Sequence, residues 1–106
     1  MSRLVGPVLR MSDLIPGIVA AIEDDNPDTD IEVTDRGAYV RIAGAPPLIV
    51  RRASIEAQLG RSFEMRELEG LLSAFAGRIE NGTDQIVFYD VANRAEPVTN
   101  GGRRPW

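Results

Sequence analysis

The sequence predicts a single α+β domain in which antiparallel strands pack on two main helices. Apolar residues recur at helical spacing in two segments and alternate with polar residues in several others, while Gly, Pro, Asn and Asp cluster between the segments. The expected order is β-α-β-β-β-α-β. With 106 residues, 43% apolar and 26% charged, the chain has the size and composition of an ordinary globular domain. We expect that domain to span residues 1–91.

Residues 4–10 are expected to be extended, and Pro7 should restrict this segment to a sheet edge or a strand start. A helix should follow, with Ser12 or Asp13 as its N-cap, because apolar residues then recur every fourth position. It must end before Pro27, since the residue preceding a proline avoids the helical region. The apolar face of this helix carries Leu14, Ile18 and Ile22, with Ile15 and Val19 beside them.

Between residues 31 and 43 the apolar period changes from 3.6 to 2, which predicts a hairpin turning at 35–37 with one buried face. Residues 43–47 should turn again, and residues 48–50 should form a further strand. Ser54 can cap a short helix that Gly60 ends. The residues expected on the buried face of the hairpin are Ile31, Val33, Ala38, Val40 and Ile42.

The second main helix is predicted over residues 64–78, followed by a turn at Asn81-Gly82 and a last strand over 86–89. Tyr39 and Phe88 are interpreted as core or near-core residues. Residues 92–106 show no periodicity and few apolar side chains, so we expect a flexible C-terminal tail. The second helix should bury Leu68, Leu71, Leu72, Phe75 and Ile79.

Several functions are made improbable by the composition. Without Cys or His, the chain lacks the commonest metal ligands, a thiolate nucleophile and the commonest general base, so we expect no cofactor and no metal. A net charge of −4 argues against nucleic-acid binding. No apolar stretch is long enough to span a membrane and no signal peptide is evident, so a cytoplasmic location is expected.

Seven acidic residues fall between Glu23 and Asp35. A calcium loop would need a Gly where Thr29 stands and a Glu where Asp35 stands, so a solvated acidic loop is the better interpretation. Glu23 to Asp25 would lie at a helix C-terminus, where the helix dipole disfavours negative charge. That local cost suits a surface used by a partner.

Paired carboxylates for acid–base catalysis could be supplied by Glu64, Glu67, Glu69 and Glu80. The first three are interleaved with the apolar face of the expected second helix, so they are interpreted as its solvated side. The sequence also contains no glycine-rich phosphate loop. We therefore do not expect an enzyme.

Over residues 5–90 the chain resembles the effector, or coupling, proteins of soluble diiron monooxygenases. That group includes the toluene and phenol monooxygenase coupling proteins and, more distantly, the methane monooxygenase regulatory protein. The similarity is closer to the toluene and short-alkene branch. The segments that carry the resemblance are Asp25-Asn26-Pro27, Ala38-Tyr39-Val40-Arg41-Ile42, Gln58-Leu59-Gly60-Arg61 and Ser73-Ala74-Phe75-Ala76-Gly77.

The resemblance implies a non-catalytic subunit without cofactors that docks on a diiron hydroxylase and tunes its active site for oxygen activation and hydrocarbon oxidation. It implies exchange with a ferredoxin at one docking surface, and a chain that is monomeric when free. The hydrocarbon is not implied, since the substrate pocket belongs to the hydroxylase. By analogy with the docked family members, the expected partner-binding residues are Asn26, Pro27, Ser73, Ala74, Gly77 and Arg78.

Other interpretations remain open at this point. Ser73, Ala74 and Gly77 would also be small if the second helix packed tightly within the domain. A stand-alone protein-binding adaptor with no role in oxygenation would show the same lack of catalytic groups, and an enzyme using carboxylates alone is the third alternative. Neighbouring hydroxylase, ferredoxin and reductase genes would distinguish an effector from an adaptor.

Overall fold

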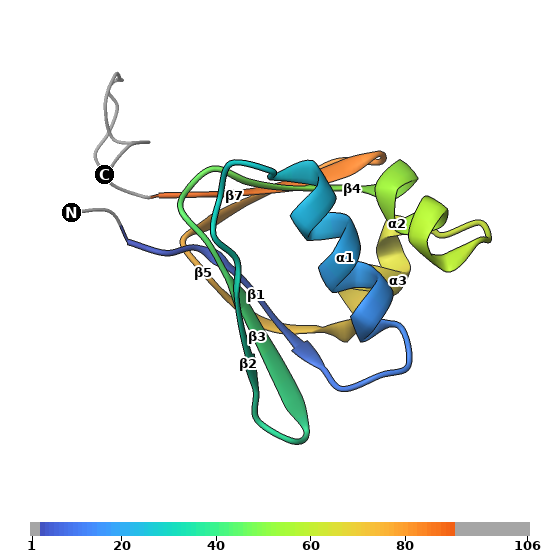
Figure 1. Cartoon of the computed structure of the whole chain (residues 1–106), viewed down its shortest axis with the longest axis horizontal. Coiled ribbons are helices and arrows are strands. Elements are labelled where there is room, and N and C mark those ends of the chain that lie inside the picture. The colour runs from blue at the N-terminus through green and yellow to red at the C-terminus, as the bar shows by residue number, and fades with distance from the viewer. Residues whose placement is uncertain (1–2, 91–106) are drawn as a thin grey trace.

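The computed structural model describes residues 3–90, so the predicted tail at 92–106 and the predicted boundary at residue 91 lie outside the described residues. The domain contains two antiparallel sheets and three helices (Figure 1), and its α+β class is confirmed. The elements are β1 (Gly6–Arg10), α1 (Ile15–Asp25), β2 (Glu32–Asp35), β3 (Tyr39–Ala43), β4 (Leu48–Arg51), α2 (Arg52–Leu59), α3 (Met65–Leu71), β5 (Leu72–Ala76), β6 (Arg78–Asn81) and β7 (Gln85–Tyr89).

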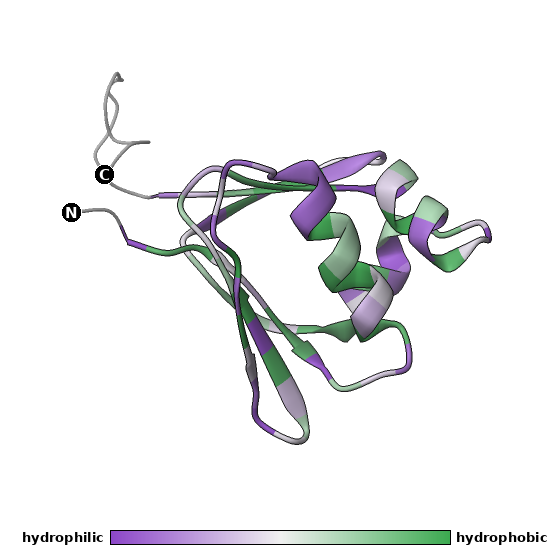
Figure 2. Ribbon diagram, viewed as in Figure 1, coloured by the Kyte–Doolittle hydropathy of each residue, from purple (hydrophilic) through white to green (hydrophobic). Residues whose placement is uncertain are grey.

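A four-stranded sheet has the order β2-β3-β1-β5, and a three-stranded sheet has the order β4-β7-β6. Helix α1 packs against α2 and β4, and its C-terminal end is hydrophilic whereas its middle is hydrophobic (Figure 2). A single core joins the helices to both sheets. Its completely or almost completely buried side chains include Leu9, Ile18, Ile22, Ile42, Leu48, Ile55, Phe63, Ile86 and Phe88.

Most of the elements predicted from periodicity are confirmed. Helix α1 ends at Asp25, two residues before Pro27, and carries a proline in its first turn. Strands β2 and β3 form the expected hairpin, although Val33 and Ala38, expected on its buried face, are exposed. Gly60 ends α2 in the left-handed conformation. Pro7 is the second residue of β1, which agrees with the expected strand start, and β1 is an interior strand paired with both β3 and β5.

The prediction of a second main helix over residues 64–78 is wrong beyond Leu71. Helix α3 begins with a reciprocal capping box between Glu64 and Glu67. The backbone N–H of Glu64 donates to the Glu67 carboxylate at 3.0 Å, and this hydrogen bond lowers the pKa of Glu67 from its usual 4.5. From Leu72 onward the chain leaves the helix without a loop and becomes β5. Pairing with β1 satisfies the backbone of both strands and outweighs an apolar spacing that suited a helix.

The predicted core position Leu68 is confirmed, since this side chain is only 3% exposed. Leu68→Ala is therefore expected to lower the free energy of unfolding by about 2–5 kcal/mol through the cavity it leaves. Urea denaturation measures this change. Val33→Ala is the matched control, because the Val33 side chain is 45% exposed and should cost less than about 0.5 kcal/mol. Equal losses in the two variants would contradict the assignment of Leu68 to the core.

Candidate docking surface

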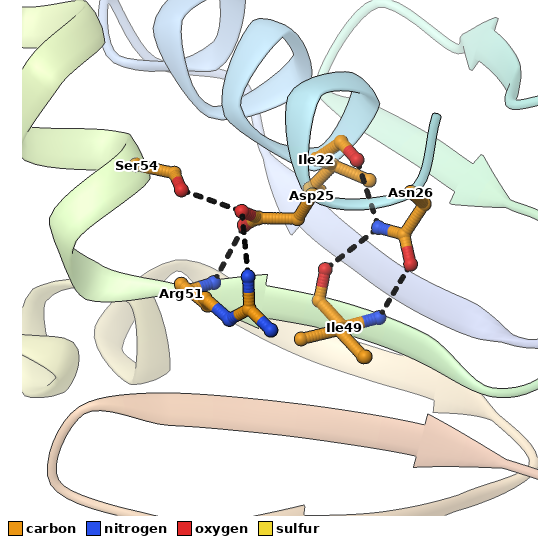
Figure 3. Close-up of polar contacts among 6 residues, drawn as sticks. All are labelled: Ile22, Asp25, Asn26, Ile49, Arg51 and Ser54. Carbon is orange, nitrogen blue, oxygen red and sulfur yellow. Dashed lines mark hydrogen bonds and ion pairs between the residues drawn. The ribbon is translucent and has the colours of Figure 1, made fainter. Parts of the chain in front are cut away.

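The turn after α1 is built around the side chain of Asn26, which is only 7% exposed. Its Nδ2 donates to the carbonyl oxygens of Ile22 at 2.8 Å and Ile49 at 2.7 Å, and its Oδ1 accepts the N–H of Ile49 at 3.0 Å (Figure 3). Asn26 thus joins the end of α1 to β4. A partner approaching this turn meets the exposed Pro27 rather than the Asn26 amide.

Asp25 holds the start of α2 against the end of α1. Its carboxylate accepts the N–H of Arg51 at 2.8 Å and the hydroxyl of Ser54 at 2.5 Å, with the Arg51 guanidinium 4.0 Å away (Figure 3). Asp24 similarly accepts a hydrogen bond from Gln58 at 2.7 Å. The positive end of the α2 dipole offsets the charge of Asp25, so the positions of Asp24 and Asp25 at the end of α1 are explained within the domain and do not by themselves indicate a partner.

Ser73, Ala74, Gly77 and Arg78 are exposed, but they do not lie on a helix as predicted. Ser73 and Ala74 belong to β5, an edge strand of the four-stranded sheet, and Arg78 begins β6, an edge strand of the three-stranded sheet. These four residues fall within one six-residue segment, 73–78, whereas Asn26 and Pro27 lie beside β4. The six predicted contact residues therefore occupy two separate places in the fold.

Gly77 connects β5 to β6 with a φ of +92°, a conformation that favours glycine. A Cβ at this position would lie 2.6 Å from both the carbonyl oxygen of Tyr89 and Cγ1 of Val5. The absence of a side chain is therefore required by contacts within the domain. This supports the alternative interpretation for Gly77, that it is small because the domain packs tightly there.

Two aromatic side chains were placed wrongly by the sequence analysis. Tyr39, expected near the core, is 43% exposed, and Phe75, expected in the buried face of a helix, is 41% exposed. Phe75 packs its ring against Phe88 with 6.0 Å between centroids, and Phe88 is buried as predicted. The edge formed by β5 therefore presents an aromatic surface next to Ser73 and Ala74.

A shallow hollow of about 400 Å³ on the outer face of the four-stranded sheet was not predicted from the sequence. Strand alternation places Tyr39 and Arg41 on the face opposite the buried Val40 and Ile42. The same alternation in the sequence indicated this outer pair, but it was used only to assign the buried face. The hollow is lined by Val8, Arg36, Tyr39, Arg41 and Ser73.

Within residues 3–90, no group of three or more Asp, Glu, His or Cys side chains is arranged to hold a metal ion. None of the helices described is long and apolar enough to cross a membrane. What the described surface offers is an aromatic and arginine-bearing sheet face beside an exposed strand edge, a combination suited to contact with another protein.

Comparison with known proteins agrees with that description. The sequence profile of the MmoB/DmpM family matches residues 3–89, and the chain belongs to this family. It is 41% identical over 87 residues to the effector subunit of the alkene monooxygenase system of Xanthobacter autotrophicus, covering 82% of this chain and 86% of that protein. It is 29% identical to the stimulatory component DmpM of phenol 2-monooxygenase from Pseudomonas sp. strain CF600, covering 82% and 94% of the two chains.

Solved structures share the fold. A chain in a structure of the phenol hydroxylase–regulatory protein complex superposes with a TM-score of 0.71 and 26% identity, covering 82% of this chain and 98% of that one. The soluble methane monooxygenase regulatory protein B superposes with a TM-score of 0.63 over 92% of this chain and 75% of its own, and its 23% identity shows the fold alone. The named relatives are effector, stimulatory or regulatory components of monooxygenase systems.

Proposed function

We propose that this chain is the non-catalytic effector subunit of a multicomponent bacterial monooxygenase and acts by docking on the diiron hydroxylase of that system. The observation that carries the proposal is the 41% identity to an alkene monooxygenase effector subunit over 86% of its length. The fold shared with a chain of a phenol hydroxylase–regulatory protein complex supports the same interaction. Docking would adjust the diiron site for oxygen activation, with an alkene or an aromatic hydrocarbon as substrate.

The contact surface in this proposal follows the exposed edge over residues 73–78, with Pro27 as a second contact. Ser73, Ala74 and Arg78 are exposed, and the outer edge of β5 has no neighbouring strand among the described residues. Asn26 and Gly77 contribute indirectly, because they fix the backbone next to the contact residues Pro27 and Arg78. Exchange with a ferredoxin on the hydroxylase, a monomeric free protein and a cytoplasmic location complete the proposal.

The direct test is reconstitution. The purified chain is added to the hydroxylase, ferredoxin and reductase encoded with it, and oxidation of an alkene and of an aromatic hydrocarbon is followed. Turnover should rise and saturate as the chain is titrated. A hydroxylase that neither binds the chain nor changes its rate would show that the proposal is wrong, and would leave the adaptor alternative standing.

The contact surface is tested by Ala74→Arg, which places a long charged side chain on the exposed edge of β5. Burying an unpaired charge at an interface typically costs several kcal/mol, so the concentration that gives half-maximal stimulation should rise about a hundredfold or more. Melting curves should stay close to wild type, since the Ala74 side chain is exposed. Ala57→Arg, the same change at an exposed position of α2, is the control. Wild-type stimulation by Ala74→Arg would place the interface elsewhere.

A further inference from the structure

The hollow on the four-stranded sheet brings together two guanidinium groups in a chain whose net charge is −4. Arg41 lies in the interior strand pair, opposite Val8 on one side and Thr34 on the other. Arg36 comes from the turn that closes the β2–β3 hairpin and lines the same hollow. The hollow is thus a locally basic site on an acidic protein.

Within residues 3–90, neither Arg36 nor Arg41 forms an ion pair or a side-chain hydrogen bond. Other arginines do, since Arg51, Arg52 and Arg61 each pair with a carboxylate. The acidic residues near the hollow do not pair with either guanidinium: Asp35 accepts the N–H of Gly37, and Glu32 lies opposite Ala43, two residue pairs beyond Arg41. The two guanidiniums are therefore available for an external anion.

An apolar and aromatic surface accompanies these charges. Val8, which is half-buried, and Tyr39, which is 43% exposed, both line the hollow. Tyr and Arg, together with Trp, are enriched among the residues that dominate binding energy at protein interfaces. The rigid fork of an arginine matches a carboxylate with two parallel hydrogen bonds, which a compact ammonium cannot do. The chemistry that fits this hollow is a carboxylate carried next to an apolar side chain.

We propose that the hollow lined by Val8, Arg36, Tyr39, Arg41 and Ser73 receives an aspartate or glutamate side chain of the hydroxylase, paired with Arg41 and flanked by an apolar neighbour. The inference rests on the proposed function. Ser73 lines the hollow and also stands on the exposed edge of β5, so the two surfaces are continuous. A second copy of this chain is the poorer occupant, since two molecules of charge −4 repel each other.

The test is a titration of the hydroxylase with Arg41→Gln and Arg36→Gln at low and high salt. Losing the paired charge should raise the Kd by about tenfold or more for Arg41→Gln at low salt, with a smaller increase for Arg36→Gln. Added salt should weaken the wild-type complex more than the Arg41→Gln complex. Arg66→Gln is the control, because Arg66 is an exposed arginine on α3, which contributes no residue to the hollow.

The outcomes separate the two proposals. If the wild-type chain neither binds nor stimulates the hydroxylase, the proposed function fails. If the wild type binds and both hollow variants bind equally well, this inference is overturned while the proposed function stands. An equal loss in Arg66→Gln would mean diffuse attraction rather than a specific site, and overturns it too. The inference is also overturned if sedimentation shows that the wild type self-associates and that Arg41→Gln does not. Arg36→Gln changes an exposed turn position, so it still decides the matter if Arg41→Gln melts early.

Discussion

Replacing Asn26 with Leu is expected to lower the free energy of unfolding by about 3–5 kcal/mol. β4 is an edge strand, and the Asn26 amide gives Ile49 both an acceptor for its N–H and a donor for its carbonyl, as a neighbouring strand would. Leucine branches at Cγ as asparagine does but satisfies neither group, and buried polar groups left unpaired cost about 1–3 kcal/mol each. Urea denaturation at neutral pH measures the change.

Asn81→Leu is the control for this prediction, because Asn81 is an exposed residue at the end of β6. It should change the free energy of unfolding by less than about 0.5 kcal/mol. Asn26→Asp should also be destabilising, since a carboxylate keeps the acceptor but loses the donor toward the carbonyls of Ile22 and Ile49. If both Asn26 variants melt like wild type, the amide does not hold α1 to β4.

Gly77→Ala should lower the free energy of unfolding by about 2–4 kcal/mol, although Gly77 is exposed. The added Cβ meets a backbone oxygen and a buried valine at 2.6 Å, and the φ of +92° is strained for any side chain. Gly70→Ala is the matched control, because that glycine lies in α3 with nothing within 4 Å of its added Cβ. There alanine should be neutral or stabilise by up to about 1 kcal/mol.

This second prediction also separates folding from docking along the same segment. Gly77→Ala should melt early, whereas Ala74→Arg should melt like wild type and bind the hydroxylase poorly. If Gly77→Ala instead kept wild-type stability and lost only its affinity for the hydroxylase, glycine would be required at this position by contact with the partner and not by packing within the domain.

Local signals predicted those elements whose boundaries are set by local chemistry. Pro27 fixed the limit of α1, and Gly60 ended α2, because proline and glycine act on the backbone within a residue or two. The α+β class and the hairpin followed from a change of apolar period. Residues 72–78 were wrongly assigned to the second helix because their structure depends on β1, more than fifty residues away, which pairs with β5.

The candidate site was predicted only in part, again because contacts between segments far apart in the sequence shape it. The exposed segment 73–78 came from the family resemblance and is indeed at the surface, but its secondary structure was wrong. The hollow around Arg41 was missed because it is assembled from three strands whose adjacency no local pattern reveals. Tyr39 was misplaced because an aromatic residue in a strand suits either face of a sheet until the covering layer is known.

The passage from β5 to β6 through the single residue Gly77 has a mechanical consequence. One continuous stretch of backbone supplies an edge strand to each sheet, so a load applied along it is shared between β1 and β7. Peeling either strand away would strain the other across the glycine joint. A hydroxylase bound along this stretch would thus contact both sheets at once, and only the folded domain would present the complete binding surface.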